Sequence, residues 1–279
     1  MKLFVSDLDG TLLNNQQRLS EETIQIINGL IANGMCFSIA TARSIASAWR
    51  IVEPLNLRLP LIVHNGVFLY DPVKKDYILS NFMDNTVTEA IMKEFTCCSV
   101  KPFVFTRNGA GEFKIYYESL QNKGQQEYYE DRVKKGDKRF TQVQDLRSHL
   151  DEQIITLVAI GSKESLQGCY ERIRDNYKVC ANFSEDIYTR DYWLELTHSK
   201  ANKRDAILAL KEMLGADALV CFGDNLNDLP MFEVADLSLA VENANDVVKR
   251  AANGIIAGNE ENGVACFLQQ YVRETLAGR

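Results

Sequence analysis

Two aspartates, Asp7 and Asp9, stand one residue apart directly after a short apolar stretch, in the segment FVSDLDGTLL. Carboxylates at the end of a buried strand are costly unless a cation or a hydrogen-bond donor pairs with them. Gly10 and Thr11 follow at once, and they suit a tight turn that exposes backbone N–H groups to an anion. Because surface turns also contain D-x-D, the pair becomes informative only with partners elsewhere in the chain.

A second acidic cluster follows another apolar stretch, in the segment GDNLND, which contains Asp224, Asn227 and Asp228. Two groups of carboxylates that meet at one edge of a sheet repel each other unless a cation lies between them. Ligands that are all oxygen atoms favour Mg²⁺, a hard ion that binds carboxylates, carbonyls, water and phosphate oxygens. Mg²⁺ is therefore the expected cofactor.

Groups suited to an anion occur in two further segments. Thr41, Ala42 and Arg43 follow a third apolar stretch, and Lys203 lies in the opening turn of a predicted helix. A helix N-terminus and an ammonium group together favour a dianion. A carboxylate nucleophile, Mg²⁺, a hydroxyl group and a lysine are what phosphoryl transfer requires, since that chemistry depends on positioning and on neutralising charge.

The elements that must position these residues follow a regular order in the first third of the chain. Residues 2–6, 35–41 and 59–66 are strand candidates, and 20–34 is an amphipathic helix candidate. Strand, helix and strand at this spacing predict a Rossmann-like, doubly wound parallel sheet, whose ligands bind at the carboxyl ends of the strands. Asp7, Thr41 and Asn65 fall at such ends.

The pattern changes in the middle of the chain and resumes near residue 198. Residues 199–215 form a helix candidate, followed by strand candidates at 218–225, 236–241 and 253–258. We therefore predict an α/β core made of 1–83 and 198–279, with an inserted α/β cap domain at 84–197. The inserted segment has strand candidates at 102–106, 112–117, 155–161, 178–184 and 187–197, and helix candidates at 85–95 and 163–177. Residues 121–139 are polar, which favours a solvated helix or loop with Tyr128 and Tyr129 exposed.

Composition narrows the class of protein. The chain has 279 residues, 46% of them hydrophobic and 25% charged, which suits a globular protein of two domains. A formal net charge of -7 argues against nucleic acid as a partner. No apolar run is long enough for a membrane span or a signal peptide, so we expect a soluble, cytoplasmic protein without a membrane partner.

Seven cysteines are scattered along the chain without a C-x-x-C pair, and there are only three histidines. This pattern argues against a zinc site and favours reduced thiols packed as small hydrophobic residues. Cys97 and Cys98 are adjacent and could be redox-active, but the sequence around them gives no support for this.

Taken together, DLDGT, the TAR variant, Lys203 and GDNLND resemble, in order, the four motifs of the haloacid dehalogenase superfamily of phosphohydrolases. The chain is most similar to the Cof-type branch, which carries a large type IIB cap between the second and third motifs. Residues 241–268 are also similar to the usual ending of that branch. The resemblance covers essentially the whole core, and in the cap it extends only to position and alternating character.

The resemblance implies a role for each matching residue. Asp7 would be the nucleophile that becomes an aspartyl phosphate. Asp9 would be the general acid and base, which protonates the leaving oxygen and then activates water. Thr41 and the backbone of Ala42 would hold the phosphoryl group, and Lys203 would steady both that group and Asp7.

The metal site implied by the resemblance consists of the Asp7 side chain, the Asp9 carbonyl and Asp224. Asp228 and Asn227 would lie beside it in supporting roles, Asp228 near the metal and Asn227 near the substrate. Ala42 replaces the glycine that is usual in this branch, which affects how closely the backbone fits a phosphate. For Arg43, contact with the substrate and a structural salt bridge both remain open.

The expected function is a Mg²⁺-dependent phosphatase that acts on a small phosphorylated metabolite, such as a sugar phosphate. A phosphotransferase or mutase on the same scaffold is one alternative. A non-catalytic protein that binds a phosphorylated metabolite is another, although such a protein would be expected to have lost Asp7 or Asp9. A large cap disfavours phosphoprotein substrates.

Overall fold

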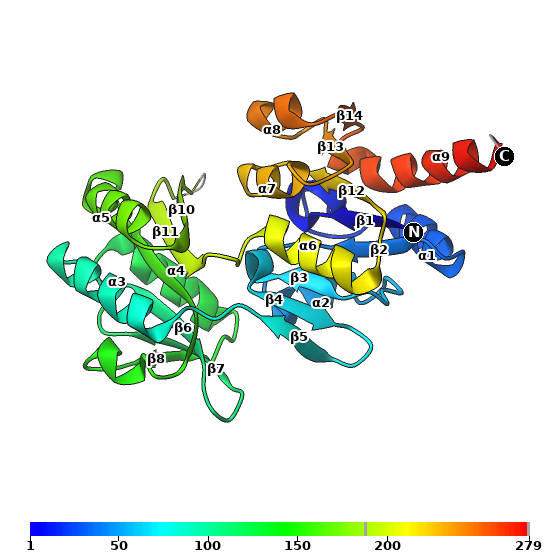
Figure 1. The fold of residues 1–279 in the computed structure, drawn as a ribbon. Coiled ribbons are helices and arrows are strands. Elements are labelled where there is room, and N and C mark those ends of the chain that lie inside the picture. Colours follow the sequence, from blue (N-terminus) through cyan, green and yellow to red (C-terminus); the bar gives the residue numbers. More distant parts are fainter. Residues whose placement is uncertain (187–188, 278–279) are drawn as a thin grey trace. The chain divides into compact units, whose positions relative to one another are not determined.

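The computed structural model describes residues 1–186 and 189–277, and the chain divides into two compact units (Figure 1). The first unit consists of Met1–Ser80 and Ala201–Arg279, and the second of Asn81–Lys200. The sequence predicts the corresponding boundaries after residues 83 and 197. Each unit contains a sheet of its own.

The sheet of the first unit has five strands in the order β14-β13-β12-β1-β2, and every pair in it is parallel. The order of the strands reverses between β1 and β12, so ligands are expected outside their carboxyl ends. The α/β class predicted from the sequence is confirmed. The strands are β1 (Lys2–Ser6), β2 (Cys36–Ile39), β12 (Ala218–Gly223), β13 (Leu237–Val241) and β14 (Gly254–Ile256).

The two central strands end at the same level of the sheet. Ser6 pairs with Phe222, and the N–H of Asp7 donates to the Phe222 carbonyl at 3.0 Å. Leu3 and Cys221 are fully buried, as expected for central strands of a parallel sheet covered on both faces. The residues that follow β1 and β12 therefore leave the sheet side by side.

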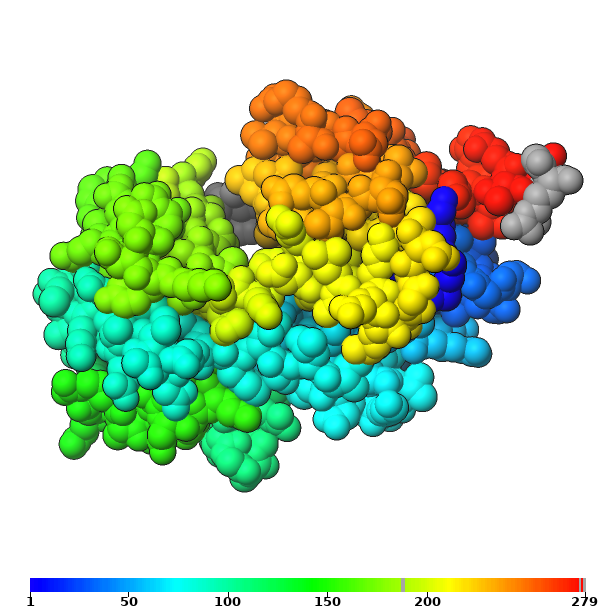
Figure 2. Space-filling model, viewed as in Figure 1, coloured from blue at the N-terminus to red at the C-terminus, as the bar shows by residue number. Residues whose placement is uncertain are grey.

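Helices of the first unit pack against this sheet and against one another. Helices α1 and α9, from opposite ends of the chain, lie side by side (Figures 1 and 2). Ser20 caps α1 by accepting a hydrogen bond from the N–H of Thr23 at 2.9 Å. The helices are α1 (Glu21–Ala32), α2 (Ile45–Val52), α6 (Lys203–Leu214), α7 (Leu229–Phe232), α8 (Asp246–Ala251) and α9 (Gly263–Ala277), and the short turns are η1 (Leu8–Leu12), η2 (His64–Gly66), η4 (Leu226–Asp228) and η5 (Asn259–Glu261).

None of the helices in the described part of the chain is long and apolar enough to cross a bilayer.

The strand predicted at 59–66 differs from the expectation. Its extended part is β3 (Leu61–Val63), which meets the end of β2 through an isolated parallel bridge between Ala40 and Ile62. Beyond it, η2 reverses the chain, and β3 pairs antiparallel with β4 (Phe68–Asp71), which pairs with β5 (Asp76–Ser80). A small three-stranded sheet therefore branches from the edge of the main one.

The second unit contains a six-stranded sheet in the order β10-β11-β9-β6-β7-β8, antiparallel except for the pair β7 and β8. The strand predicted at 187–197 corresponds to β11, which begins at Tyr192; positions 187 and 188 lie outside the described residues. The strands are β6 (Phe103–Arg107), β7 (Phe113–Tyr117), β8 (Phe140–Gln142), β9 (Gln153–Gly161), β10 (Val179–Glu185) and β11 (Tyr192–His198), and the helices are α3 (Asn85–Cys97), α4 (Lys123–Lys134), α5 (Lys163–Asn176) and the turn η3 (Leu146–His149).

Alternate residues of this second sheet contribute to two separate cores. Leu157 and Ala159 pack with α3 and α5, whereas Val158 and Ile160 point to the opposite face. The expectation that Tyr128 is exposed is wrong, because α4 packs on that opposite face. The Tyr128 ring lies 5.4 Å from the Phe103 ring and 5.1 Å from the Trp193 ring, and Tyr129 joins the same core.

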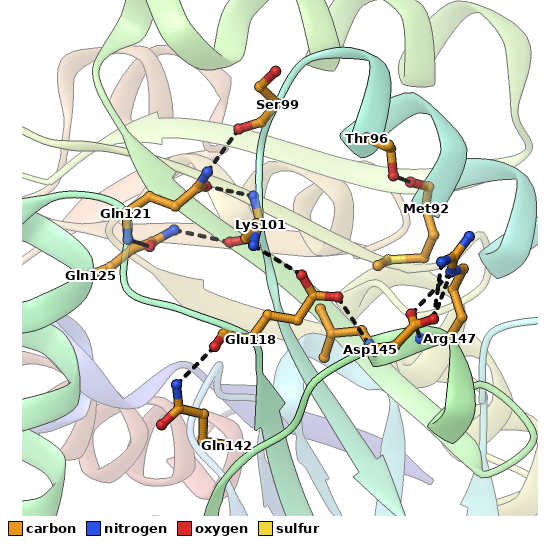
Figure 3. Close-up of polar contacts among 11 residues, drawn as sticks. Met92, Thr96, Ser99, Lys101, Glu118, Gln121, Gln125, Gln142, Asp145 and Arg147 are labelled. Carbon is orange, nitrogen blue, oxygen red and sulfur yellow. Dashed lines mark hydrogen bonds and ion pairs between the residues drawn. The ribbon is translucent and has the colours of Figure 1, made fainter.

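Polar contacts attach the start of α4 to the segment that precedes β6 (Figure 3). Gln121 accepts from the Lys101 N–H at 2.7 Å and donates to the Ser99 carbonyl at 2.9 Å. The buried Gln125 side chain accepts from the Gln121 N–H at 2.7 Å and donates to the Lys101 carbonyl at 3.0 Å. An ion pair of 3.2 Å joins Lys101 to Glu118. Both ends of the buried Gln125 amide are therefore satisfied.

Replacing Gln125 with leucine is expected to lower the free energy of unfolding by about 2 kcal/mol, because the Gln121 N–H and the Lys101 carbonyl lose the partner that the buried Gln125 amide provides. Urea denaturation of the wild type and of Gln125→Leu measures the difference. Gln126→Leu is the matched control, since Gln126 is exposed and its side chain donates to Glu130 on the same helix. Equal destabilisation by the two variants would contradict this account.

Candidate active site

Three aspartates meet outside the carboxyl ends of β1 and β12. Each of Asp7, Asp224 and Asp228 offers a carboxylate oxygen, and these oxygens lie within 4.8 Å of one another. Asp7 is 6% exposed and Asp228 is fully buried. Such a cluster is stable only with cations close by.

Lys203 is the cation of this cluster, and it is itself almost fully buried. Its Nζ donates to Asp7 Oδ1 at 2.5 Å and to Asp228 Oδ1 at 2.6 Å. Burial alone would lower the pKa of Lys203, but Asp228 and Asp7 raise it above its ordinary value. Lys203 therefore stays charged and holds two of the three carboxylates.

The position of Lys203 depends on a close approach between η2 and the start of α6. Gly66 in η2 has a φ of +98°, and a Cβ at this position would lie 2.3 Å from the Asn202 carbonyl oxygen. Asn202 caps α6 by accepting from the Asp205 N–H at 2.8 Å. The turn after β3 thus supports the helix terminus that carries Lys203, and a side chain larger than hydrogen at Gly66 would displace it.

Asp228 accepts hydrogen bonds from the backbone in addition to the one from Lys203. Its Oδ2 accepts hydrogen bonds from the N–H groups of Asp224 at 2.9 Å and Asn225 at 3.0 Å. Both oxygens of Asp228 therefore already have donors, and they fix the loop after β12. The sequence predicts Asp228 beside the metal, and its contacts make it the residue that shapes the loop carrying Asp224.

The turn η1 places Gly10 and Thr11 of the DLDGT motif against Asp224. Thr11 donates its hydroxyl hydrogen to Asp224 Oδ1 at 2.8 Å. Gly10 has a φ of +79°, and a Cβ on it would lie 2.5 Å from Asp224 Oδ2. Asn243 donates to the Gly10 carbonyl at 2.7 Å. The glycine after Asp9 is therefore needed both for the turn and for the space that Asp224 occupies.

The charges of the cluster do not balance. Burial raises the pKa of Asp7 well above its ordinary value, and the nearby Asp228 and Asp224 raise it further, although Lys203 lowers it. Burial also raises the pKa of Asp224 to about 6, against the hydrogen bond from Thr11. One ammonium group faces three carboxylates, and every remaining ligand atom is oxygen. This donor set fits a hard divalent cation such as Mg²⁺.

Asp9 lies outside the three-aspartate cluster, and its carboxylate pairs with Arg43. Arg43 Nε donates to Asp9 Oδ2 at 2.7 Å, and Nη2 donates to Oδ1 at 2.5 Å. Nη2 also donates to Gln17 Oε1 at 2.9 Å. The hydrogen bond to Asp9 raises the pKa of Arg43, against the effect of burial. The sequence leaves two roles open for Arg43, substrate contact and a structural salt bridge. The salt bridge is present in the structure, with Asp9 as its partner.

The remaining predicted residues lie in loops that hydrogen bonds join together. The buried Thr41 hydroxyl accepts from the Arg43 N–H at 3.1 Å, and Ala42 lies between these two residues in the same loop. The Thr41 carbonyl accepts from the Asn65 N–H at 2.9 Å, and Asn227 donates to Asn65 Oδ1 at 3.2 Å. The loops after β2, β3 and β12 are connected in this way.

Three side chains shape the site in ways that sequence reasoning did not predict; it named Thr11 only as a turn residue and did not name Gln17 or Asn243. Thr11, Gln17 and Asn243 contact Asp224, Arg43 and the Gly10 carbonyl, respectively. Thr11 could have been found, because it belongs to the DLDGT motif and carries a hydroxyl. Gln17 and Asn243 stand in polar loops without a distinguishing pattern in the sequence.

A protein-family model described as haloacid dehalogenase-like hydrolase matches residues 4–268. A curated relative, a 5-amino-6-(5-phospho-D-ribitylamino)uracil phosphatase of Bacillus subtilis, is 27% identical over 273 residues, which cover 96% of this chain and 97% of the relative.

Solved structures share the fold. A protein from Thermotoga maritima is 25% identical, with a TM-score of 0.77 and 96% of each chain covered. A sugar phosphatase of subclass IIB of the haloacid dehalogenase superfamily is 18% identical, with a TM-score of 0.73, and the match covers 97% of this chain and 99% of that one. The family, the fold class and the enzyme class expected from the four motifs are confirmed, and the chain belongs to the haloacid dehalogenase-like hydrolases.

Proposed function

We propose that the protein is a Mg²⁺-dependent phosphatase of small phosphomonoesters, such as sugar phosphates or related metabolites, which acts through an aspartyl phosphate on Asp7. The observation that carries this proposal is the buried Lys203 between Asp7 and Asp228, beside Asp224, at the carboxyl ends of β1 and β12. Membership of the hydrolase family supports the reaction class.

Asp7 is the proposed nucleophile. Lys203 engages Oδ1 of its carboxylate, which leaves Oδ2 as the atom that attacks phosphorus. The bond from phosphorus to the leaving oxygen breaks, and the phosphoryl group is transferred to Asp7. Water then attacks this acyl phosphate and releases inorganic phosphate. Thr41, Ala42, Asn227 and Lys203 are the proposed contacts of the transferred group.

Asp9 is the proposed general acid and base. It gives a proton to the leaving oxygen in the first step and removes one from water in the second. In the structure both of its oxygens accept hydrogen bonds from Arg43. At least one of these bonds must therefore open before Asp9 can carry a proton, and a phosphate dianion that draws Arg43 toward itself would open it.

The proposed metal ligands are the carboxylates of Asp7 and Asp224 and the carbonyl of Asp9, with Asp228 in support. Bound Mg²⁺ would neutralise the charge that these carboxylates and the phosphoryl group bring together. Asp224 is suited to this role because Thr11 occupies only its Oδ1. Gly10 keeps the space beside Oδ2 free of a side chain.

The substrate class is proposed from the relatives and the composition. The Bacillus subtilis relative is a phosphatase of a ribitylamino-uracil phosphate, which supports a phosphate ester of a small polyol or sugar. The net charge of -7 disfavours nucleic acid as a partner. A cytoplasmic location remains a proposal that rests on the sequence.

A phosphotransferase on the same scaffold would use the same residues and differ only in the acceptor. Phosphate release from a panel of sugar and polyol phosphates, measured with Mg²⁺ and then with EDTA, tests the proposal. We expect release from a few compounds that stops when EDTA removes the metal. Release that needs an added sugar acceptor would favour the transferase, and stable binding without turnover would favour the non-catalytic alternative.

Asp7→Asn is expected to lower kcat by at least about 1,000-fold, since the nucleophile is lost. In metal-free protein the same variant should unfold at the same temperature as the wild type or a higher one, because it removes one of three clustered carboxylates. Asp228→Asn should instead lower the free energy of unfolding by about 3 kcal/mol, because the Asp228 carboxylate both pairs with Lys203 and accepts from two backbone N–H groups, whereas Asp7→Asn leaves Lys203 paired with Asp228. Turnover by Asp7→Asn at the wild-type rate would rule out this nucleophile.

Arg43→Met is expected to lower kcat/KM by about 10-fold or more, because Asp9 loses the group that orients its carboxylate. Steady-state kinetics with the preferred substrate measures the change. Arg50→Met is the control, since Arg50 is exposed and lies in the last turn of α2, the helix that follows Arg43. Wild-type kinetics for Arg43→Met would show that the salt bridge has no part in the reaction.

A further inference from the structure

The adjacent cysteines of the second unit have different surroundings. Cys98 is the C-cap of α3 and is partly buried, whereas Cys97, the last residue of α3, is exposed. Arg172 on α5 donates from Nη2 to Cys98 Sγ at 2.7 Å. A guanidinium group therefore lies against one thiol of the pair.

A second thiol faces the same place. Cys169 precedes Arg172 by three residues on α5, so both side chains lie on one side of that helix. Cys169 is buried in the core between α3 and α5, and Cys98 packs against this core. Burial, together with the hydrogen bond between the Cys169 and Cys98 thiols, raises the pKa of Cys169. The two thiols are therefore neighbours: Cys98 is partly accessible to solvent, and Cys169 is buried.

Arg172 places a positive charge directly against Cys98 Sγ. A neighbouring Arg or Lys is one of the surroundings that mark reactive cysteines in proteins. Glu94 shares this guanidinium at 3.7 Å from Nε and is itself held by the Tyr177 hydroxyl at 3.0 Å. Arg172 thus bridges Glu94 and Cys98.

We propose that Cys98 is a site of oxidation by hydroperoxides and that Cys169 completes the reaction by forming a disulfide with it. This modification site is independent of the hydrolytic reaction.

In the first step the Cys98 sulfur attacks a peroxide oxygen. The O–O bond breaks, an S–O bond forms, and water or an alcohol leaves, so that Cys98 becomes a sulfenic acid. In the second step the Cys169 sulfur attacks the Cys98 sulfur, an S–S bond forms, and the hydroxyl group leaves as water with the proton of Cys169. The two thiols lose two electrons, and the hydroperoxide accepts them.

The two exposed thiols, Cys97 and Cys266, serve as internal references. Cys97 is adjacent in sequence to Cys98, and Cys266 donates to the Glu261 carbonyl at 3.7 Å. If exposure alone determined oxidation, Cys97 and Cys266 would react before the partly buried Cys98. If the guanidinium determines it, Cys98 reacts first.

The test treats the reduced, full-length protein with hydrogen peroxide, blocks the remaining thiols with iodoacetamide and maps the peptides by mass spectrometry. We expect a peptide pair linked through Cys98 and Cys169 that is two hydrogens lighter than the reduced peptides. Oxidation of Cys97 or Cys266 ahead of Cys98 would overturn the proposal. A sulfenic acid trapped on Cys98 without the disulfide would overturn the role of Cys169.

Variants separate the role of Arg172 from general accessibility. Arg172→Met should slow the oxidation of Cys98 by at least about threefold at neutral pH, since the cation in contact with Cys98 Sγ is removed. Arg174→Met is the control, because Arg174 lies on the same helix and pairs with Asp175. Cys169→Ala should leave the sulfenic acid of Cys98 unresolved and trappable by dimedone. Equal rates for the two arginine variants would overturn the role of Arg172.

Discussion

The buried contact of Lys203 with Asp7 and Asp228 is the interaction on which the site depends. It joins residues 196 positions apart, so it can form only when β1, β12 and the start of α6 are all in place. A buried ion pair of this kind contributes little net stability, because removing both charges from water is costly. Its value lies in geometry, since one ammonium group fixes the nucleophile and the loop after β12 together.

The main features of this arrangement were accessible from the sequence. Apolar stretches that end in acids predicted that Asp7 and Asp224 would lie at strand ends, and parallel topology brings such ends to one edge. Lys203 was predicted in the first turn of a helix, where it lies. Short-range signals sufficed because each chemical residue directly follows or opens a regular element.

The contacts that the sequence did not predict are those between loops or between the outer faces of helices. Neither Arg43 with Asp9 nor Cys98 with Arg172 follows from periodicity, since each pair depends on side-chain direction after the fold has formed. The antiparallel sheet of β3, β4 and β5 was not predicted from the sequence for a related reason. A short apolar segment has the same sequence pattern in a parallel sheet as at the start of a hairpin. In the structure, the positive φ angles in η2 mark the point where the chain reverses and the hairpin begins.

A cluster with too much negative charge explains why so many of its neighbours are constrained. Three carboxylates around one ammonium group are less stable than an apolar core of the same size, so their positions must be imposed by the backbone. Position 10 must be glycine because the Asp224 carboxylate occupies the space that a side chain there would need. Two backbone N–H groups hold Asp228. The rigid turns keep the carboxylates together against their repulsion, and that repulsion in turn provides the attraction for a divalent cation.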